Sequence, residues 1–185
     1  MPDWLWIVIA VAALIVLAGV VWAVLARRRR EHLRERFGPE YDHTVTEHDD
    51  RRSAEAELER REKQRERLDI VPLAPESRER YLASWRDLQT GFVDEPERSV
   101  GEADSLVTEV MRERGYPMDE FDQRVADISV DHPNVVEHYR AAHGISMASD
   151  KGEASTEDLR QAVVHYRALF EELVEERETA GEGVR

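Results

Sequence analysis

The chain has 185 residues, a length that suits one globular domain of ordinary size with an additional segment. It carries 26 lysine and arginine residues against 40 aspartate and glutamate residues. The resulting formal net charge of −14 excludes nucleic-acid binding through phosphate contacts unless a basic face is segregated from the rest. Cysteine is absent, which excludes disulfide bonds, thiolate catalysis and zinc sites with sulfur ligands.

Residues 4–26 form an apolar stretch of 23 residues without a charged side chain. A helix of that length reaches about 35 Å, which exceeds the roughly 30 Å of a bilayer's hydrocarbon core. Trp4, Trp6 and Trp22 lie near the two ends of the stretch, and indole rings favour the headgroup layer. The composition therefore predicts a transmembrane anchor over residues 1–26.

Four consecutive arginines follow the apolar stretch, whereas Asp3 is the only charged residue before it. A cleaved signal peptide has the basic residues first, so the order here favours a permanent anchor. Because arginine-rich flanks stay in the cytoplasm, we expect a single pass through the bacterial inner (plasma) membrane, with the N-terminus outside and the rest of the chain cytoplasmic. The lipid bilayer is then the first expected partner. The residues expected at the membrane interface are Trp4, Trp6, Trp22, Arg27, Arg28, Arg29 and Arg30.

Residues 27–75 are expected to form a charged juxtamembrane spacer. Gly38 and Pro39 predict a break between the helix that leaves the membrane and a second helix. Residues 51–68 contain only four apolar residues, so they predict a solvated single helix or a partly disordered segment, and no coiled coil. Pro72 and Pro75 mark the end of the spacer.

Residues 76–178 predict an acidic all-α domain with about five helices, followed by a flexible tail over residues 179–185. The helices are expected to begin near residues 76, 94, 121, 131 and 155. Gly115 predicts the end of the second helix, and Ser155 with Asp158 predicts the N-terminal cap of the fifth. The apolar residues at helical spacing are Tyr81, Trp85, Leu88, Phe92, Val100, Ala103, Leu106, Val107, Val110, Met111, Phe121, Val125, Ile128, Val135, Val136, Tyr139, Ala142, Leu159, Ala162, Val163, Tyr166, Leu169, Phe170 and Leu173.

The tetrapeptide His-Tyr-Arg-Ala occurs twice, at residues 138–141 and 165–168. One hypothesis is that neighbouring antiparallel helices bring the two histidines and two arginines together as an anion site. The alternative is that Tyr139 and Tyr166 face the core. Successive helical residues point about 100° apart, so the flanking histidine and arginine would then lie on opposite sides. The residues of the hypothetical anion site are His138, Arg140, His165 and Arg167.

Other chemical signals are weaker. His143 lies in the apolar stripe of the fourth predicted helix and is interpreted as a hydrogen-bonded core residue. The sequence contains no HExxH motif, calcium loop, glycine-rich phosphate loop or nucleophile elbow, so no cofactor, metal or catalytic residue is predicted. An acidic run near the C-terminus is either a solvated face or a patch for a basic protein partner. It consists of Glu171, Glu172, Glu175 and Glu176.

Three segments carry a resemblance: LRERFGPEYD at residues 33–42, SVDHP at 129–133 and STEDLRQAVVHYR at 155–167. Together they resemble an uncharacterised family of small bacterial proteins with an N-terminal single-pass anchor. Members of that family are described as membrane or secreted proteins of unknown function. The resemblance therefore implies no catalytic or binding residues.

These observations favour a membrane-anchored cytoplasmic interaction or scaffold module over an enzyme. The alternative function is a small-ligand sensor or enzyme that uses the helical core and the two His-Tyr-Arg-Ala segments. Nucleic acid is not expected as a partner, and the sequence leaves the oligomeric state open.

Overall fold

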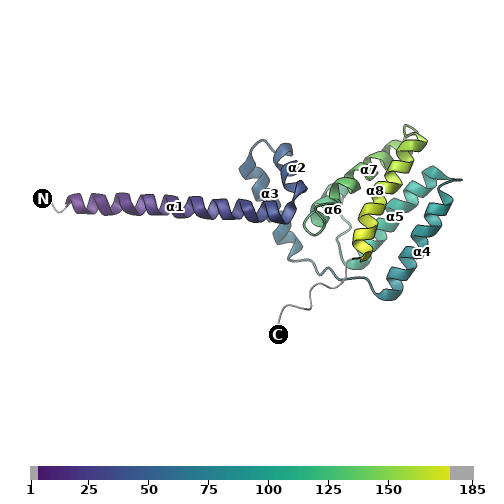
Figure 1. Cartoon of the computed structure of the whole chain (residues 1–185), viewed down its shortest axis with the longest axis horizontal. Helices are drawn as coiled ribbons and strands as arrows, with labels where there is room; N and C mark the ends of the chain where they lie inside the picture. Colours follow the sequence, from purple (N-terminus) through teal and green to yellow (C-terminus); the bar gives the residue numbers. More distant parts are fainter. Residues whose placement is uncertain (1–3, 176–185) are drawn as a thin grey trace. The chain divides into compact units, whose positions relative to one another are not determined.

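The computed structural model describes residues 4–175, and the side chains of residues 12–175. This part of the chain folds into eight helices and contains no strand (Figure 1). The all-α class predicted from the sequence is therefore confirmed for the described residues. The chain divides into two compact units, Met1–Leu58 and Glu59–Arg185.

The first unit contains α1 (Trp4–Phe37), α2 (Pro39–Glu47) and the first half of α3 (Arg51–Arg65). Gly38 separates α1 from α2 with a φ of +46°, and Pro39 opens α2, as the sequence predicted. Glu55 of α3 joins the three helices. Its Oε1 accepts hydrogen bonds from Tyr41 Oη of α2 at 3.0 Å and from Arg30 Nε of α1 at 3.1 Å. The buried residues of this unit are Leu33, Phe37, Glu40, Tyr41, Thr44, Ala54 and Leu58.

No helix within the described part of the chain is both long and apolar enough to cross a bilayer. The apolar residues of α1 with described side chains run from 12 to 26. Beyond them α1 carries four arginines and then enters the core of the first unit through Leu33 and Phe37.

This finding contradicts the transmembrane helix predicted from residues 4–26. It equally contradicts the single-pass topology and the inner-membrane localisation with an outer N-terminus and a cytoplasmic domain. The helix does continue through the charged residues, as expected, but α1 then enters a packed unit through Leu33 and Phe37. The side chains of Trp4 and Trp6, expected at the interface, lie outside the described residues.

The segment expected to be a solvated or partly disordered spacer is helical and partly buried. Ala54 and Leu58 of α3 are 0% exposed, because two apolar residues four positions apart share one face of the helix. At the other end of α3, Arg65 forms an ion pair with Asp131, so this end belongs to the second unit. The two units divide after Leu58, whereas the sequence predicted a boundary at residue 75. The difference arises because Asp131, 66 positions further along the chain, holds Arg65 at the end of α3.

The second unit also contains five further helices: α4 (Pro75–Gly91), α5 (Pro96–Arg114), α6 (Phe121–Ile128), α7 (Val136–Asp150) and α8 (Thr156–Glu175). α8 packs against α7, α5 and α4, and α6 packs against α7 (Figure 1). The rings of Trp85 and Phe170 stack at the centre, with centroids 4.6 Å apart. Of the apolar residues predicted for the core, only Phe92, Phe121, Val135 and Val163 are partly rather than fully buried.

Two of the predicted helix ends are confirmed by the structure. Gly115 ends α5 in the left-handed conformation, with a φ of +99°. Ser155 caps α8, because its Oγ accepts the Asp158 N–H at 3.2 Å while Asp158 Oδ2 accepts the Ser155 N–H at 2.9 Å. The fourth helix, however, begins at Val136 and not near residue 131. The His132 N–H bonds to the Ile128 carbonyl at 2.9 Å, so this segment continues the turn after α6.

Candidate functional site

The repeated tetrapeptide lies on α7 and α8, which the short connection from Asp150 to Thr156 joins as an antiparallel pair. His138 Nδ1 and His165 Nδ1 are 2.9 Å apart. The ring centroids are 5.1 Å apart, so the two nitrogens lie between the rings and the imidazoles meet edge to edge. Burial lowers the pKa of His165, and the neighbouring His138 lowers it further. The contact between the two Nδ1 atoms is an N–H···N hydrogen bond, and the tautomers of the two rings decide which one donates.

The two tyrosines of the repeat lie in the core. Tyr139 and Tyr166 are 0% exposed, and their rings meet in a T-shaped contact with centroids 6.4 Å apart. Tyr166 Oη donates to Asp104 Oδ1 of α5 at 2.7 Å. Burial raises the pKa of Tyr166 far above its ordinary value, and the adjacent Asp104 carboxylate adds to the increase. Burial likewise raises the pKa of Tyr139 to about 12.

The two arginines of the repeat are not brought together. Arg140 Nη1 lies 3.3 Å from Glu137 Oε2, and Arg167 Nε lies 2.6 Å from Glu171 Oε1, each pair on a single helix. The structure thus places the histidines of the hypothetical anion site side by side and leaves each arginine with a carboxylate of its own helix. Two residues of the acidic run near the C-terminus lie beside basic side chains. Glu171 takes Arg167, Glu172 lies 3.6 Å from His132 Nδ1, and Glu176 lies outside the described residues.

A polar cluster surrounds Asp104. His143 stacks on Phe121 with centroids 3.7 Å apart, and its Nδ1 lies 4.0 Å from Asp104 Oδ1. Burial lowers the pKa of His143 against the opposing effect of Asp104. Tyr139 Oη, Thr108 Oγ1 and His143 Nδ1 are buried without a hydrogen-bond partner among the described atoms. Sequence reasoning missed Asp104, although a carboxylate directly after Ala103 in an apolar stripe is a detectable signal.

An open groove lies between α4 and α5, and sequence reasoning missed it as well. Leu88 and Leu106 form its floor, and small residues of the two helices form its walls. The adjoining hollows have volumes of about 620 and 400 Å³ and share part of their lining. Its residues are Ser84, Asp87, Leu88, Gly91, Glu95, Arg98, Ser99, Gly101, Glu102, Ser105, Leu106 and Glu109.

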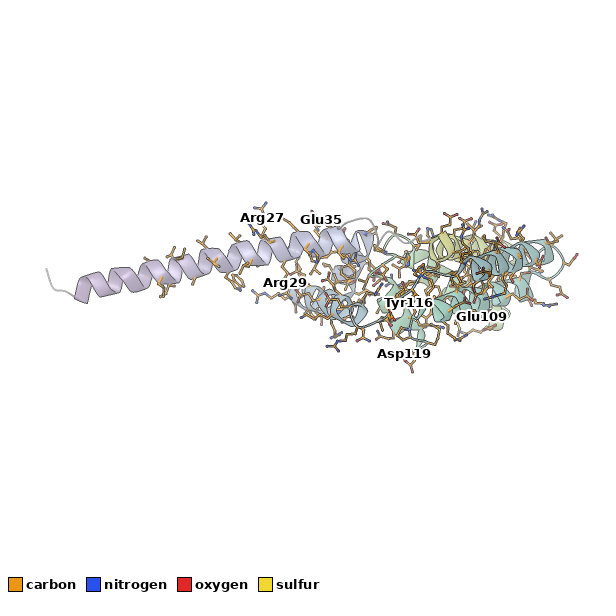
Figure 2. The ribbon with its side chains drawn as sticks, turned by 90° about the horizontal axis from the view of Figure 1, so that it is seen from below. Arg27, Arg29, Glu35, Glu109, Tyr116 and Asp119 are labelled. Atoms are coloured by element: carbon orange, nitrogen blue, oxygen red, sulfur yellow. The ribbon has the colours of Figure 1, made fainter. Side chains whose placement is uncertain are left out.

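The charge of this groove is negative. Asp87, Glu95, Glu102 and Glu109 oppose one cation, Arg98, among the residues that line it. Arg98 is held by Glu95 and Glu102, each at 2.8 Å, so its charge is already matched. Glu109 stands on α5 at one end of the groove and is labelled in Figure 2.

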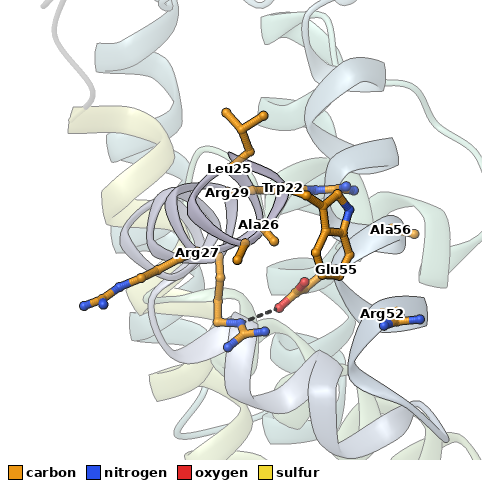
Figure 3. Close-up of a pocket in the computed structure, with 10 residues that line it drawn as sticks. Trp22, Leu25, Ala26, Arg27, Arg29, Arg52, Glu55 and Ala56 are labelled. Carbon is orange, nitrogen blue, oxygen red and sulfur yellow. Dashed lines mark hydrogen bonds and ion pairs between the residues drawn. The ribbon is translucent and has the colours of Figure 1, made fainter. Parts of the chain in front are cut away.

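The first unit has a cavity of its own, of about 730 Å³, between α1 and α3 (Figure 3). Trp22 and Ala26 supply apolar surface, and Arg27, Arg29 and Arg30 supply charge. Arg30 and Glu55, which both line the cavity, form an ion pair at 3.1 Å, and the dashed line in Figure 3 ends on the Glu55 carboxylate. The arginines expected at a membrane interface thus line a cleft within this unit, and Arg28 is exposed.

No group of three or more histidine and carboxylate side chains suited to hold a metal ion occurs in the described part of the chain. No protein-family model matches the sequence, and neither the curated proteins nor the solved structures contain a significant match. The resemblance to a family of anchored bacterial proteins therefore stays a prediction.

Proposed function

We propose that the second unit is an interaction module that binds a basic, amphipathic helix of a protein partner in the groove between α4 and α5. The observation that carries this proposal is the composition of the groove, in which two leucines and four carboxylates line the same surface. Lysine and arginine side chains of the partner would meet the carboxylates, and its apolar side chains would cover Leu88 and Leu106.

The small residues support a helix as the occupant. The groove is lined in part by residues with small side chains or none, Ser84, Gly101 and Ser105. A Cβ added at Gly101 would meet nothing within 4 Å. Packed helix axes are about 8–10 Å apart, and small side chains at the contact allow the shorter distances. The floor residues are already largely buried, so the apolar contribution is modest and electrostatic attraction dominates. Such binding is fast and weakens with added salt.

The matched test fills the groove without disturbing the fold. Gly101 and Gly144 are both exposed glycines within helices, and a Cβ added at either one would meet open space, but only Gly101 lines the groove. The probe is a fluorescent amphipathic peptide of leucine, alanine and lysine, and the readout is its anisotropy with the full chain. We expect Gly101→Leu to weaken binding at least about tenfold, equivalent to 1.4 kcal/mol, and Gly144→Leu to leave it unchanged.

Charge variants test the second half of the proposal. Glu102→Gln with Glu109→Gln is expected to weaken binding and to reduce its dependence on salt, whereas Glu137→Gln on α7 should do neither. Equal binding by wild type, Gly101→Leu and the double glutamine variant would show that the groove is not the docking site.

A second candidate function, a small-ligand sensor, rests on the buried polar atoms near Asp104. Tyr139 Oη, Thr108 Oγ1 and His143 Nδ1 are buried without a hydrogen bond among the described atoms, although His143 Nδ1 lies 4.0 Å from Asp104 Oδ1, and such groups favour a polar guest. A small polar compound that raises the melting temperature of wild type, but not of Tyr139→Phe, would support this function. Failure of a broad thermal-shift screen would remove it.

A further inference from the structure

We propose that His138 and His165 form a metal clamp that binds one Cu²⁺ or Ni²⁺ ion and links α7 to α8. The two Nδ1 atoms are 2.9 Å apart and come from helices that pack side by side. The site belongs to a different face from the α4/α5 groove and does not depend on the proposed function.

The separation of the nitrogens is compatible with two neighbouring ligands of one metal ion. Two imidazole nitrogens bound to one ion at about 2.05 Å and at right angles to each other are about 2.9 Å apart. Right angles between ligands occur in square-planar and octahedral coordination, and nitrogen ligands in such a geometry are typical of Cu²⁺ and Ni²⁺. Tetrahedral Zn²⁺ requires a wider angle, so it would have to spread the two rings.

The surroundings leave room for the ion. His138 and His165 are partly exposed, so water can occupy the remaining coordination positions. In both copies of the repeat an alanine lies one turn after the histidine, as Ala141 and Ala168, where a larger side chain would crowd the rings. In the metal-free arrangement one Nδ1 carries the proton of the N–H···N contact. When the metal binds, that ring holds its proton on Nε2, and a rotation of each ring about its Cβ–Cγ bond turns both Nδ1 lone pairs toward a common point.

The local charge also favours a cation. Residues 70–185 carry 26 acidic and 13 basic side chains, and the arginine of each repeat has a carboxylate partner on its own helix, Glu137 for Arg140 and Glu171 for Arg167. Each repeat thus contributes one ligand, one core tyrosine, one neutralised arginine and one small residue that clears space.

The test is calorimetric titration of the full chain with Cu²⁺ and with Ni²⁺. We expect one ion per chain. His138→Gln and His165→Gln should each weaken binding at least about 100-fold, because the second nitrogen acts as an intramolecular ligand. His32→Gln, at an exposed histidine of the first unit, and Arg167→Gln, beside the clamp, should leave the affinity unchanged. Far-UV circular dichroism checks the fold of each variant.

A second measurement uses the unaltered chain. Substoichiometric Cu²⁺ should broaden the imidazole ¹⁵N signals of His138 and His165 before those of the other five histidines. Binding that survives the double variant His138→Gln/His165→Gln, broadening of other histidines first, or no saturable binding by wild type would each overturn the proposal. In those cases the two rings form an N–H···N hydrogen bond only.

Discussion

Replacing Gly115 by alanine is expected to destabilise the second unit strongly. Gly115 has a φ of +99°, in the left-handed region that costs an alanine about 1–2 kcal/mol. An added Cβ would also lie 2.5 Å from the carbonyl oxygen of Asp69, a backbone atom that cannot turn away. Overpacking of this kind costs about 1–3 kcal/mol, so Gly115→Ala should lower the free energy of unfolding by about 2–5 kcal/mol.

Two other glycines separate the backbone effect from the steric one. Gly152 has a φ of +70° but nothing within 4 Å of an added Cβ, so Gly152→Ala should lose only the backbone contribution of about 1–2 kcal/mol. Gly101 lies inside α5 with open space and no positive φ, so Gly101→Ala should stabilise the chain by about 0.5–1 kcal/mol.

The assay is urea denaturation of the three variants, followed by far-UV circular dichroism and by hydrogen exchange of the Val71 amide. That amide donates to the Arg114 carbonyl at 2.9 Å, next to the proposed clash, so it should lose protection in Gly115→Ala alone. If Gly115→Ala and Gly152→Ala were equally destabilised, the contact between Gly115 and Asp69 would have no energetic weight and the reasoning would fail.

Three further predictions concern buried polar groups. Arg114→Leu should lower the free energy of unfolding by about 2–3 kcal/mol, because the buried guanidinium donates to the carbonyls of Val71 and Leu173 and leucine cannot replace these hydrogen bonds. Chemical denaturation measures this loss, and an unchanged midpoint would contradict the prediction. Tyr166→Phe should cost about 1.5–3 kcal/mol through loss of the bond to Asp104, and in a double-mutant cycle Asp104→Asn should then cost less than it does in wild type; additive losses would show that the pair is not coupled. Burial raises the pKa of Asp127, so the folded chain binds this proton more tightly than the unfolded chain, and stability should fall as the pH rises from the unfolded pKa through the raised folded pKa. Asp127→Asn should remove that decline and raise the melting temperature at neutral pH, and melting curves over a pH series that run parallel for both proteins would refute it.

The helical elements could be predicted because their signals are local. Apolar residues three and four positions apart place one face of a helix against the core, and that spacing located Tyr81, Trp85 and Leu88 on α4. Glycine and proline at helix ends act on the backbone next to them, so Gly115 and Pro39 were also interpreted correctly. The membrane segment was predicted by the same local logic, and the described part of α1 contradicts it.

The candidate site depended on which flanks of two helices face each other. The repeat was visible in the sequence, and the 100° step between neighbours showed that the tyrosines and the histidines must separate. It did not show that the flank with His165 is the one that α8 turns toward α7, so the pairing of His138 with His165 was not expected from the geometry. That orientation follows from how α8 packs against α5 and α7 together.

By itself, the sequence determined the helical class, most helix limits and the core residues of the second unit, since these follow from spacing and from backbone preferences within a few residues. Only the tertiary structure decided the partners of the polar groups. Tyr166 meets Asp104 62 positions away, and Arg114 reaches the Leu173 carbonyl 59 positions away. A hydrogen bond requires two atoms within about 3 Å in space, and no local pattern along a chain encodes that distance between residues so far apart.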